Sequence, residues 1–502
     1  METQNKNEKL KQVLGAVVAV LVTAFLFSRS GMAREVHTSL GQKQSRTVLR
    51  VWDWWSPSTD EKFGHYFAAV KKEFEELHPD VELVFQYVPF GQYEQKMATA
   101  LVGNSPPDVF QSSVSWAEGF YDRGMLMPLN SFLDSPESRA LPPEQRLTRD
   151  RFLESSWRHN TKPDGTIFGI PQILDASCLA WNLDILKEAA QTDAEIRGMF
   201  VQNPDGSPNY THLKADAIKD WEMFRRVTRN LTTRDAQSNV IQAGFAIHAH
   251  GSGAAPFMPW WVTNGTNFQD SAGTHTLFDS PEGVEAVRFL LDLYWKDKVS
   301  FPFRRQMDVD EVFNQGKSAC VTSGTWAGKY TRRNTDGKLH FDMTPFPPGP
   351  HGNGQATVAW GNMLVIPKRA RQVKLAWEYI QFICSKPGSL RLLKHLGQNS
   401  PRLDFYDTPE WGEMCKQFPD LINIPAICAS GKKLRYTQSN AVDYASQSIF
   451  ETLLLHYPDI EQGKGGFPSV KIAVDTAAGA VNRVYERYNW QVEQWNKEEA
   501  KQ

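Results

Sequence analysis

The stretch TVLRVWDWWSPSTDEKFGHYFAAVKKEFEELHPDVELVFQYVPFGQYEQKMATALVGNSPPDVF, residues 47–110, decides the fold class. It opens with an alternating, β-rich segment, Thr47 to Trp52, that predicts a strand. Apolar residues at helical spacing then predict a helix from Lys62 to Leu77. A second strand, a second helix and a third strand follow, at 81–88, 93–102 and 106–110. Alternating strands and helices predict an α/β fold in which helices cover a parallel sheet.

The bulk composition describes an ordinary globular protein. The chain has 502 residues, a formal net charge of -2, 41% hydrophobic residues and 22% charged residues. That length predicts more than one domain. No basic stripe interleaved with aromatic residues is present, so the sequence gives no support for nucleic-acid binding.

The N-terminus predicts export. Three lysines, Lys6, Lys9 and Lys11, precede the uncharged apolar run Val13 to Phe27, and small residues follow it. A basic start, a short apolar run and small residues are typical of an export signal. We therefore interpret residues 1–46 as a signal or anchor segment with a linker. This places the protein in the periplasm or on the extracellular face of the membrane. Retention of residues 13–27 as an anchor is the alternative.

The cysteines do not predict a metal site or a disulfide scaffold. Five are present, sparse and without CxxC spacing: Cys178, Cys320, Cys384, Cys415 and Cys428. Structural zinc sites need closely spaced ligand pairs, so we expect no metal. Buried free thiols are the favoured state, and a Cys415–Cys428 disulfide is the alternative.

Motifs for catalysis are missing from the chain. A phosphate-binding loop ending at Gly316-Lys317-Ser318 fails, because Glu311 stands where its first glycine belongs. GxSxG and HExxH are also absent. The sequence therefore predicts a protein that is not an enzyme, without catalytic residues or cofactor. A pair of carboxylates acting as a glycosidase remains an alternative, because spacing in the sequence cannot locate such a pair.

Tryptophan is the most informative residue type for function. Sixteen are present, and several follow strand ends or lie in glycine-rich turns. Indole rings on loops can grip a sugar, which has apolar faces and polar rims. Ligands of parallel sheets gather at the carboxyl ends of strands. The residues that follow such ends here are Trp54, Trp55, Ser112, Ser113 and Trp116. Further candidates in turns are Trp260, Trp261, Trp326 and Trp360.

Motifs along most of the chain resemble the extracellular solute-binding proteins of bacterial ABC transporters. The similar group is family 1, the sugar-binding group that includes maltose-binding protein. The segments that carry the resemblance are VWDWW (51–55), FEELHP (74–79), PDVF (107–110), DGTIFGIP (164–171), WNLDIL (181–186), FNQGKSAC (313–320), GTW (324–326), AWEYI (376–380) and GQNSPR (397–402). Each is short, and their order and spacing make the resemblance specific.

The resemblance implies a two-lobed, type II periplasmic-binding-protein fold of the α/β class, with a cleft between lobes joined by crossing strands. Expected crossings lie near 170–175, 343–346 and 403–405. The first lobe would comprise residues 47–171 and 345–402. The second lobe would comprise 172–344 and 403–502.

The resemblance also assigns roles in the cleft. Tryptophan faces would stack on the ligand, with one of Trp260 and Trp261 turned toward it. Asp175, Asn362 and Arg402 would hydrogen-bond its hydroxyls, as would Ser112 and Ser113. Arg402 has an alternative role, in which a salt bridge pins a turn of the chain.

The implied function is capture of a carbohydrate and its delivery to the membrane permease of an ABC importer, by a monomer that binds no nucleic acid. Three alternatives stay open: a non-sugar solute such as a polyamine or phosphorylated polyol, a ligand sensor, and an exported carbohydrate-active enzyme.

Overall fold

The computed structural model describes residues 46–103, 105–247, 256–270, 274–302, 309–432 and 439–499. The chain divides into two compact units, residues 1–48 with 75–82 and residues 49–74 with 83–502. In the first unit, Arg46 and Glu75 form an ion pair at 3.2 Å. The hydrophobic clusters and the candidate site described below lie in the second unit.

Within the described residues, eight strands form one mixed sheet, and two small hairpins lie outside it. The sheet order is β10-β4-β11-β3-β1-β2, with β9 paired to β4 and β12 paired to β11. β1 and β3 are parallel, whereas β11 runs antiparallel to both β3 and β4. The strands are β1 (Thr47–Asp53), β2 (Val81–Tyr87), β3 (Val109–Ser113), β4 (Ile170–Asn182), β5 (Phe200–Gln202), β6 (Pro208–Leu213), β7 (Thr233–Arg234), β8 (Val240–Gln242), β9 (Cys320–Gly324), β10 (Phe341–Thr344), β11 (Thr357–Val365) and β12 (Gly431–Lys432).

Helices connect the strands and extend the C-terminal part of the chain. The α-helices are α2 (Glu61–Leu77), α3 (Phe90–Val102), α4 (Val114–Asp122), α5 (Asn130–Leu133), α6 (Pro136–Ala140), α7 (Glu154–His159), α8 (Leu183–Ala189), α9 (Ala194–Arg197), α10 (Trp221–Asn230), α11 (Met258–Thr263), α12 (Pro281–Trp295), α13 (Val309–Asn314), α14 (Gly328–Asn334), α15 (Val373–Cys384), α16 (Lys386–Leu396), α17 (Pro409–Gln417), α18 (Ile424–Ala429), α19 (Ser439–Glu461) and α20 (Val470–Glu499). Short 3₁₀ helices are η2 (Pro143–Gln145), η3 (Arg149–Arg151), η4 (Leu403–Phe405) and η5 (Pro419–Leu421).

The alternating strands and helices at the start of the described chain form as the sequence pattern predicts. α2 buries Tyr66, Phe67, Val70 and Phe74, which recur at helical spacing along one face. β3 continues to Ser113, three residues beyond the predicted strand, and α4 begins directly after it. The side chain of Ser113 accepts a hydrogen bond from the backbone N–H of Trp116, so this serine caps α4.

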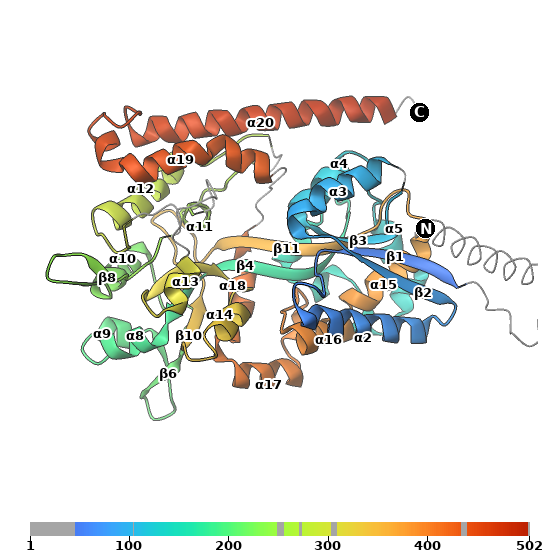
Figure 1. Ribbon diagram of the computed structural model, residues 1–502, viewed down its shortest axis with the longest axis horizontal. Helices are drawn as coiled ribbons and strands as arrows, with labels where there is room; N and C mark the ends of the chain where they lie inside the picture. Colours follow the sequence, from blue (N-terminus) through green and yellow to red (C-terminus); the bar gives the residue numbers. More distant parts are fainter. Residues whose placement is uncertain are drawn as a thin grey trace, which may run out of the picture. The chain divides into compact units, whose positions relative to one another are not determined.

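Among the described residues, two of the hydrophobic clusters contact opposite ends of β11. One draws on Val88 to Leu126 with Phe168, Met363 and Val365. The other contains Trp181, Trp260 and Val358, together with apolar residues of α12, α19 and α20. The two halves of β11 thus pack into different clusters. Figure 1 shows β4 and β11 side by side, passing from the neighbourhood of α10 and α11 to that of α3 and α4.

The segment 345–358, which the sequence-based expectation assigned to the first lobe, contributes side chains to one of these clusters. Phe346, Ala356 and Val358 lie in the cluster that contains Trp260. The expected crossing at 343–346 includes the end of β10, which pairs with β4 from Leu179 to Asn182. β11 is a long strand whose two ends contact these two clusters. The third expected crossing, 403–405, is the 3₁₀ helix η4.

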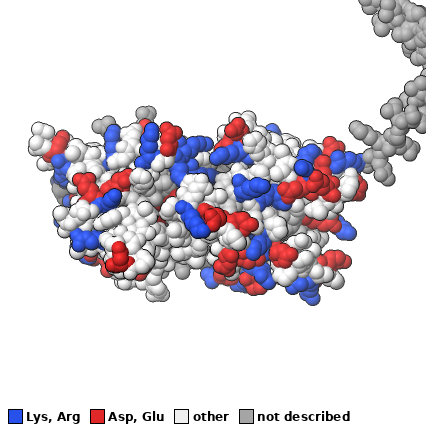
Figure 2. Space-filling model, turned by 90° about the horizontal axis from the view of Figure 1, so that it is seen from below, with Lys and Arg blue, Asp and Glu red and all other residues white. Residues whose placement is uncertain are grey.

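Two features of the chain bear on its surroundings. Among the residues that the structure describes, no helix is both long enough and apolar enough to cross a membrane. The predicted export or anchor run, residues 13–27, lies outside the described residues. On the face drawn in Figure 2, lysine and arginine side chains are interspersed with aspartate and glutamate.

Candidate functional site

A short band of solvent-reachable residues crosses the middle of the sheet. β11 is buried at both ends and half-buried at its centre, Trp360, Gly361 and Asn362. Asp175 is the half-buried residue of β4, whose other residues are buried. Ser113 is the half-buried residue of β3, and the four residues before it are buried.

The strand register brings these residues together. Asn362 lies directly opposite Ser113, and Trp360 lies directly opposite Asp175. Opposite residues of an antiparallel pair project to one face of the sheet, as do residues two apart in one strand. Ser113, Asn362, Trp360 and Asp175 therefore line one face as a continuous polar and aromatic band.

Asp175 is the carboxylate of this band, and two polar side chains hold it, one of which is bonded in turn to Lys329. Thr325 Oγ1 donates a hydrogen bond to Asp175 Oδ1 at 2.9 Å. Gln398 Nε2 lies 3.3 Å from each carboxylate oxygen. Lys329 Nζ donates to Gln398 Oε1 at 2.6 Å. Burial raises the pKa of Asp175 to about 6, although Lys329 and both hydrogen bonds favour its charged form.

Trp360 has a fixed orientation on this face. Its Nε1 donates to Ser177 Oγ at 3.3 Å, and Ser177 lies two residues beyond Asp175 in β4. The indole packs partly against the cluster that contains Trp260 and stays half-buried. A ring held at its polar edge can offer a flat face to a sugar without losing much rotamer freedom on binding.

The turn after β1 sends two tryptophans into different aromatic groups. Trp54 makes edge contacts with Tyr93 and Trp116, at centroid distances of 5.0 and 5.8 Å. Trp55 stacks on Phe63 at 5.5 Å with an interplanar angle of 3°. Both tryptophans are half-buried, so they retain surface that solvent reaches. Trp116 is 9% exposed and mainly packs in the neighbouring cluster.

Trp326 is the most exposed of the candidate tryptophans. It follows β9 and is 37% exposed. Its ring folds back over Gly324, where an added Cβ would lie 2.1 Å from the indole. Trp326 neighbours Thr325, which holds Asp175, so the structure brings this tryptophan close to the band.

The sequence profile of one protein family matches most of this chain. The bacterial extracellular solute-binding protein profile aligns with residues 58–389, more than half of the chain. The chain belongs to this family. The sequence-based resemblance is therefore confirmed.

Curated relatives of this solute-binding protein are distant in sequence. The maltodextrin-binding protein of Bacillus subtilis is 20% identical over 420 residues, which cover 78% of this chain and 89% of the relative. An arabinooligosaccharide-binding protein of the same organism is 22% identical over 386 residues, which cover 74% and 78%.

Solved structures show the same fold. The cyclic α-maltosyl-1,6-maltose-binding protein of Arthrobacter globiformis superposes with a TM-score of 0.67 at 18% identity, covering 88% of this chain and all of that one. The GacH receptor of Streptomyces glaucescens superposes with a TM-score of 0.62 at 19% identity, covering 88% and 99%. The prediction of an α/β, two-lobed, type II fold is confirmed.

Two predicted ligand residues of this solute-binding protein belong to its core. Trp260 and Trp261 lie on α11, and both are 0% exposed. Trp260 packs against Phe289 and Phe346, and Trp261 stacks on Phe278 at 4.7 Å. The expectation that one of them faces a cleft is wrong for this structure, because the surrounding rings enclose both.

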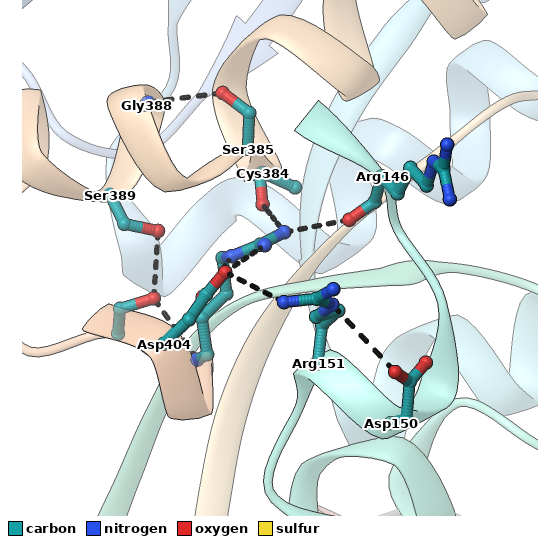
Figure 3. Close-up of polar contacts among 10 residues, drawn as sticks. Arg146, Asp150, Arg151, Cys384, Ser385, Gly388, Ser389 and Asp404 are labelled. Atoms are coloured by element: carbon teal, nitrogen blue, oxygen red, sulfur yellow. Dashed lines mark hydrogen bonds and ion pairs between the residues drawn. The ribbon is translucent and has the colours of Figure 1, made fainter. Parts of the chain in front are cut away.

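Arg402 also has a structural position. It is 0% exposed, and its Nε and Nη2 donate to the two carboxylate oxygens of Asp404 at 2.8 and 2.7 Å. Its Nη1 donates to the carbonyl oxygen of Arg146 at 2.9 Å. Figure 3 shows Asp404, Arg146 and Cys384 gathered around this network. The alternative interpretation, a salt bridge that pins the chain, is the arrangement found.

Ser112 is likewise turned away from the band. It is 0% exposed, and its hydroxyl donates to the carbonyl oxygen of Ser113 at 3.1 Å. Successive residues of a strand point to opposite faces, so Ser113 and Ser112 cannot both face the band. Of the two serines, Ser113 is the one that the register places beside Asn362.

Sequence reasoning missed the residues that hold Asp175. Thr325 and Gln398 lie within the quoted motifs GTW and GQNSPR, and Lys329 follows the first of these at the start of α14. The one signal in the sequence was that Thr325 stands next to Trp326, a candidate ligand residue. The five cysteines are free in the structure, and four of them are buried as predicted, whereas Cys415 is half-buried.

Proposed function

We propose that this protein is the extracytoplasmic substrate-capturing subunit of an ABC importer and that its ligand is a carbohydrate, specifically an oligosaccharide. The observation that carries the proposal is the band across the shared sheet, where Trp360, Asp175, Asn362 and Ser113 lie on one face. Membership of the extracellular solute-binding family supports the importer role. The maltodextrin- and arabinooligosaccharide-binding relatives support the ligand class.

In this proposal, the two lobes of the protein meet at the long strands β4 and β11. Each half of β11 packs into its own hydrophobic cluster, with Val358 in one and Met363 and Val365 in the other. We therefore place the second passage between lobes within β11, and keep the first within β4 near residue 171. Bending at these strands would open and close the band, as in hinge motions of binding proteins.

The chemistry of the band suits a neutral, polyhydroxylated ligand. Indole faces can stack on sugar C–H groups, and Asn362 and Ser113 offer short hydrogen-bonding groups. Within the described residues, Asp175 is the carboxylate of the band, and Lys329 reaches it through Gln398. A polyamine would need several carboxylates, and a phosphorylated ligand would need several arginines or lysines.

No covalent step is needed for this role. Ligand binding stabilises the closed form by the difference in affinity between closed and open forms. We propose that the closed monomer, rather than any reaction product, is what the membrane permease recognises.

Direct titration of the purified protein tests the ligand class. Maltose, maltotriose, arabinotriose, spermidine and glycerol phosphate are each added while tryptophan fluorescence and heat of binding are recorded. We expect saturable binding of an oligosaccharide and none of spermidine or glycerol phosphate. Binding of either charged compound without sugar binding would replace the carbohydrate proposal. Release of reducing ends from a polysaccharide would instead favour an enzyme.

A further inference from the structure

An exposed phenylalanine begins the helix α3. Phe90 is the first residue of this helix and is 58% exposed. The N–H of Val88 donates to the carbonyl oxygen of Asp53 at 2.9 Å, which ties the segment before the helix to the end of β1. The N–H of Gln92 donates to the carbonyl oxygen of Pro89 at 2.9 Å, and the proline ring fixes the φ angle directly before Phe90. The start of α3 therefore holds Phe90 in place close to the turn that follows β1.

The ring of Phe90 belongs to an aromatic group whose other members are more enclosed. Its centroid lies 5.6 Å from the ring of Trp54 and 5.2 Å from that of Trp116. Trp116 also stacks on Tyr93 at 6.1 Å. Tyr93 is buried, Trp116 is 9% exposed and Trp54 is half-buried. Phe90 is thus the member of this group that is most open to solvent.

The aromatic group continues the band that crosses the sheet. On β3 the band ends at Ser113, which lies directly opposite Asn362. Ser113 Oγ accepts a hydrogen bond from the backbone N–H of Trp116 at 3.4 Å, so Trp116 lies in the first turn of the helix that starts at this end of the band. The contact between Trp116 and Phe90 then extends the line of side chains from the sheet to an exposed phenyl ring.

We propose that Phe90 forms an outer sugar subsite: its ring stacks on a unit of the oligosaccharide that lies beyond Ser113, so the site favours ligands long enough to reach it. A phenyl ring offers an apolar face to sugar C–H groups, as an indole does. A single exposed apolar side chain is common on protein surfaces, and the continuity of this one with the band is what carries the inference. The inference rests on the proposed function and adds to it a selection for ligand length.

A chain-length series measures this subsite. Calorimetry with the full protein gives the affinities for the two- to five-unit members of the maltose series and of the arabinose series. In a series that binds, Phe90→Ala should lower the affinity for the longest sugar by about three- to tenfold and for the shortest by less than about twofold. Phe90→Leu, which is apolar but has no ring, should lose as much as the alanine variant, and Phe90→Tyr should keep wild-type affinity. Val102→Ala is the matched control, because Val102 is 59% exposed at the other end of α3.

The outcomes separate the subsite from the proposed function. Wild-type affinity of Phe90→Ala for every sugar that binds would overturn the subsite and leave the carbohydrate proposal intact. An equal loss for the shortest and the longest sugar would also overturn it, because Phe90 would then support Trp54 and Trp116 rather than contact the ligand. If no sugar of either series binds the wild type, the proposed function and the subsite fall together. Urea unfolding of each variant should match the wild type, since the side chain of Phe90 is largely exposed.

Discussion

Trp360 of β11 lies directly opposite Asp175 of β4, at the point where both strands are half-buried. The pairing places an indole beside a carboxylate in the middle of a sheet that is otherwise buried there. A polar residue at such a position lowers stability unless it is hydrogen-bonded, and Asp175 is held by Thr325 and Gln398. The two hydrogen bonds thus hold the carboxylate on the face that the proposed ligand would occupy.

Replacing Trp360 by alanine should weaken oligosaccharide binding by about tenfold, because one stacked ring contributes about 0.5–1.5 kcal/mol beyond its burial. Calorimetric titration measures the change. Trp490→Ala is the matched control, since Trp490 is 61% exposed on α20 and lies outside the band. Equal loss of affinity in both variants would remove Trp360 from the site.

The first strand and helix could be predicted from the sequence because their signals lie within short stretches of the chain. Alternation in residues 47–52 and helical spacing in 62–77 gave β1 and α2, and thereby the position of Trp54 and Trp55. The pairing of Trp360 with Asp175 could not be predicted, because it depends on the register of two strands far apart in the chain.

Burial was the other property that local pattern did not reveal. The segment PFMPWWVTNG around Trp260 contains two prolines and an Asn-Gly pair, which are typical of a loop. In the structure it contains the short helix α11, whose six residues are all buried. Arg402 carried a local signal that favoured the structural role, because Asp404 stands two residues away and forms its ion pair.

Asp175 should make stability depend on pH. Its folded-state pKa, about 6, lies above the ordinary value of 3.8, so its contribution is present in acid and is lost as pH rises through about 6. Urea unfolding between about pH 4.5 and about pH 7 should show a shallower fall for Asp175→Asn than for the wild type. Asp164→Asn is the control, because its pKa is lowered and its titration lies below this window. An unchanged slope in Asp175→Asn would contradict the raised pKa.

Removing Arg402 should reduce stability without changing the ligand site. Arg402→Met leaves Asp404 and the carbonyl oxygen of Arg146 without their donor, which should lower the free energy of unfolding by about 3 kcal/mol. Arg151→Met is the matched control, because Arg151 is more exposed and lies 3.9 Å from Asp404, so it should cost less than about 1 kcal/mol. Chemical denaturation measures both. Reduced sugar affinity with unchanged stability in Arg402→Met would restore its predicted role as a ligand residue.

Gly324→Ala should displace Trp326, because the new Cβ would lie 2.1 Å from the indole ring. The ring is 37% exposed and can swing outward, so we expect a loss of only about 1 kcal/mol in stability but a clear change in fluorescence. The change is assigned to Trp326 by repeating the measurement in Trp326→Phe. Gly412→Ala is the control, since a Cβ at Gly412 of α17 meets nothing within 4 Å. If Trp326 stacks on the ligand, Gly324→Ala lowers sugar affinity and Gly412→Ala does not. A displaced ring with full affinity would exclude Trp326 from the site.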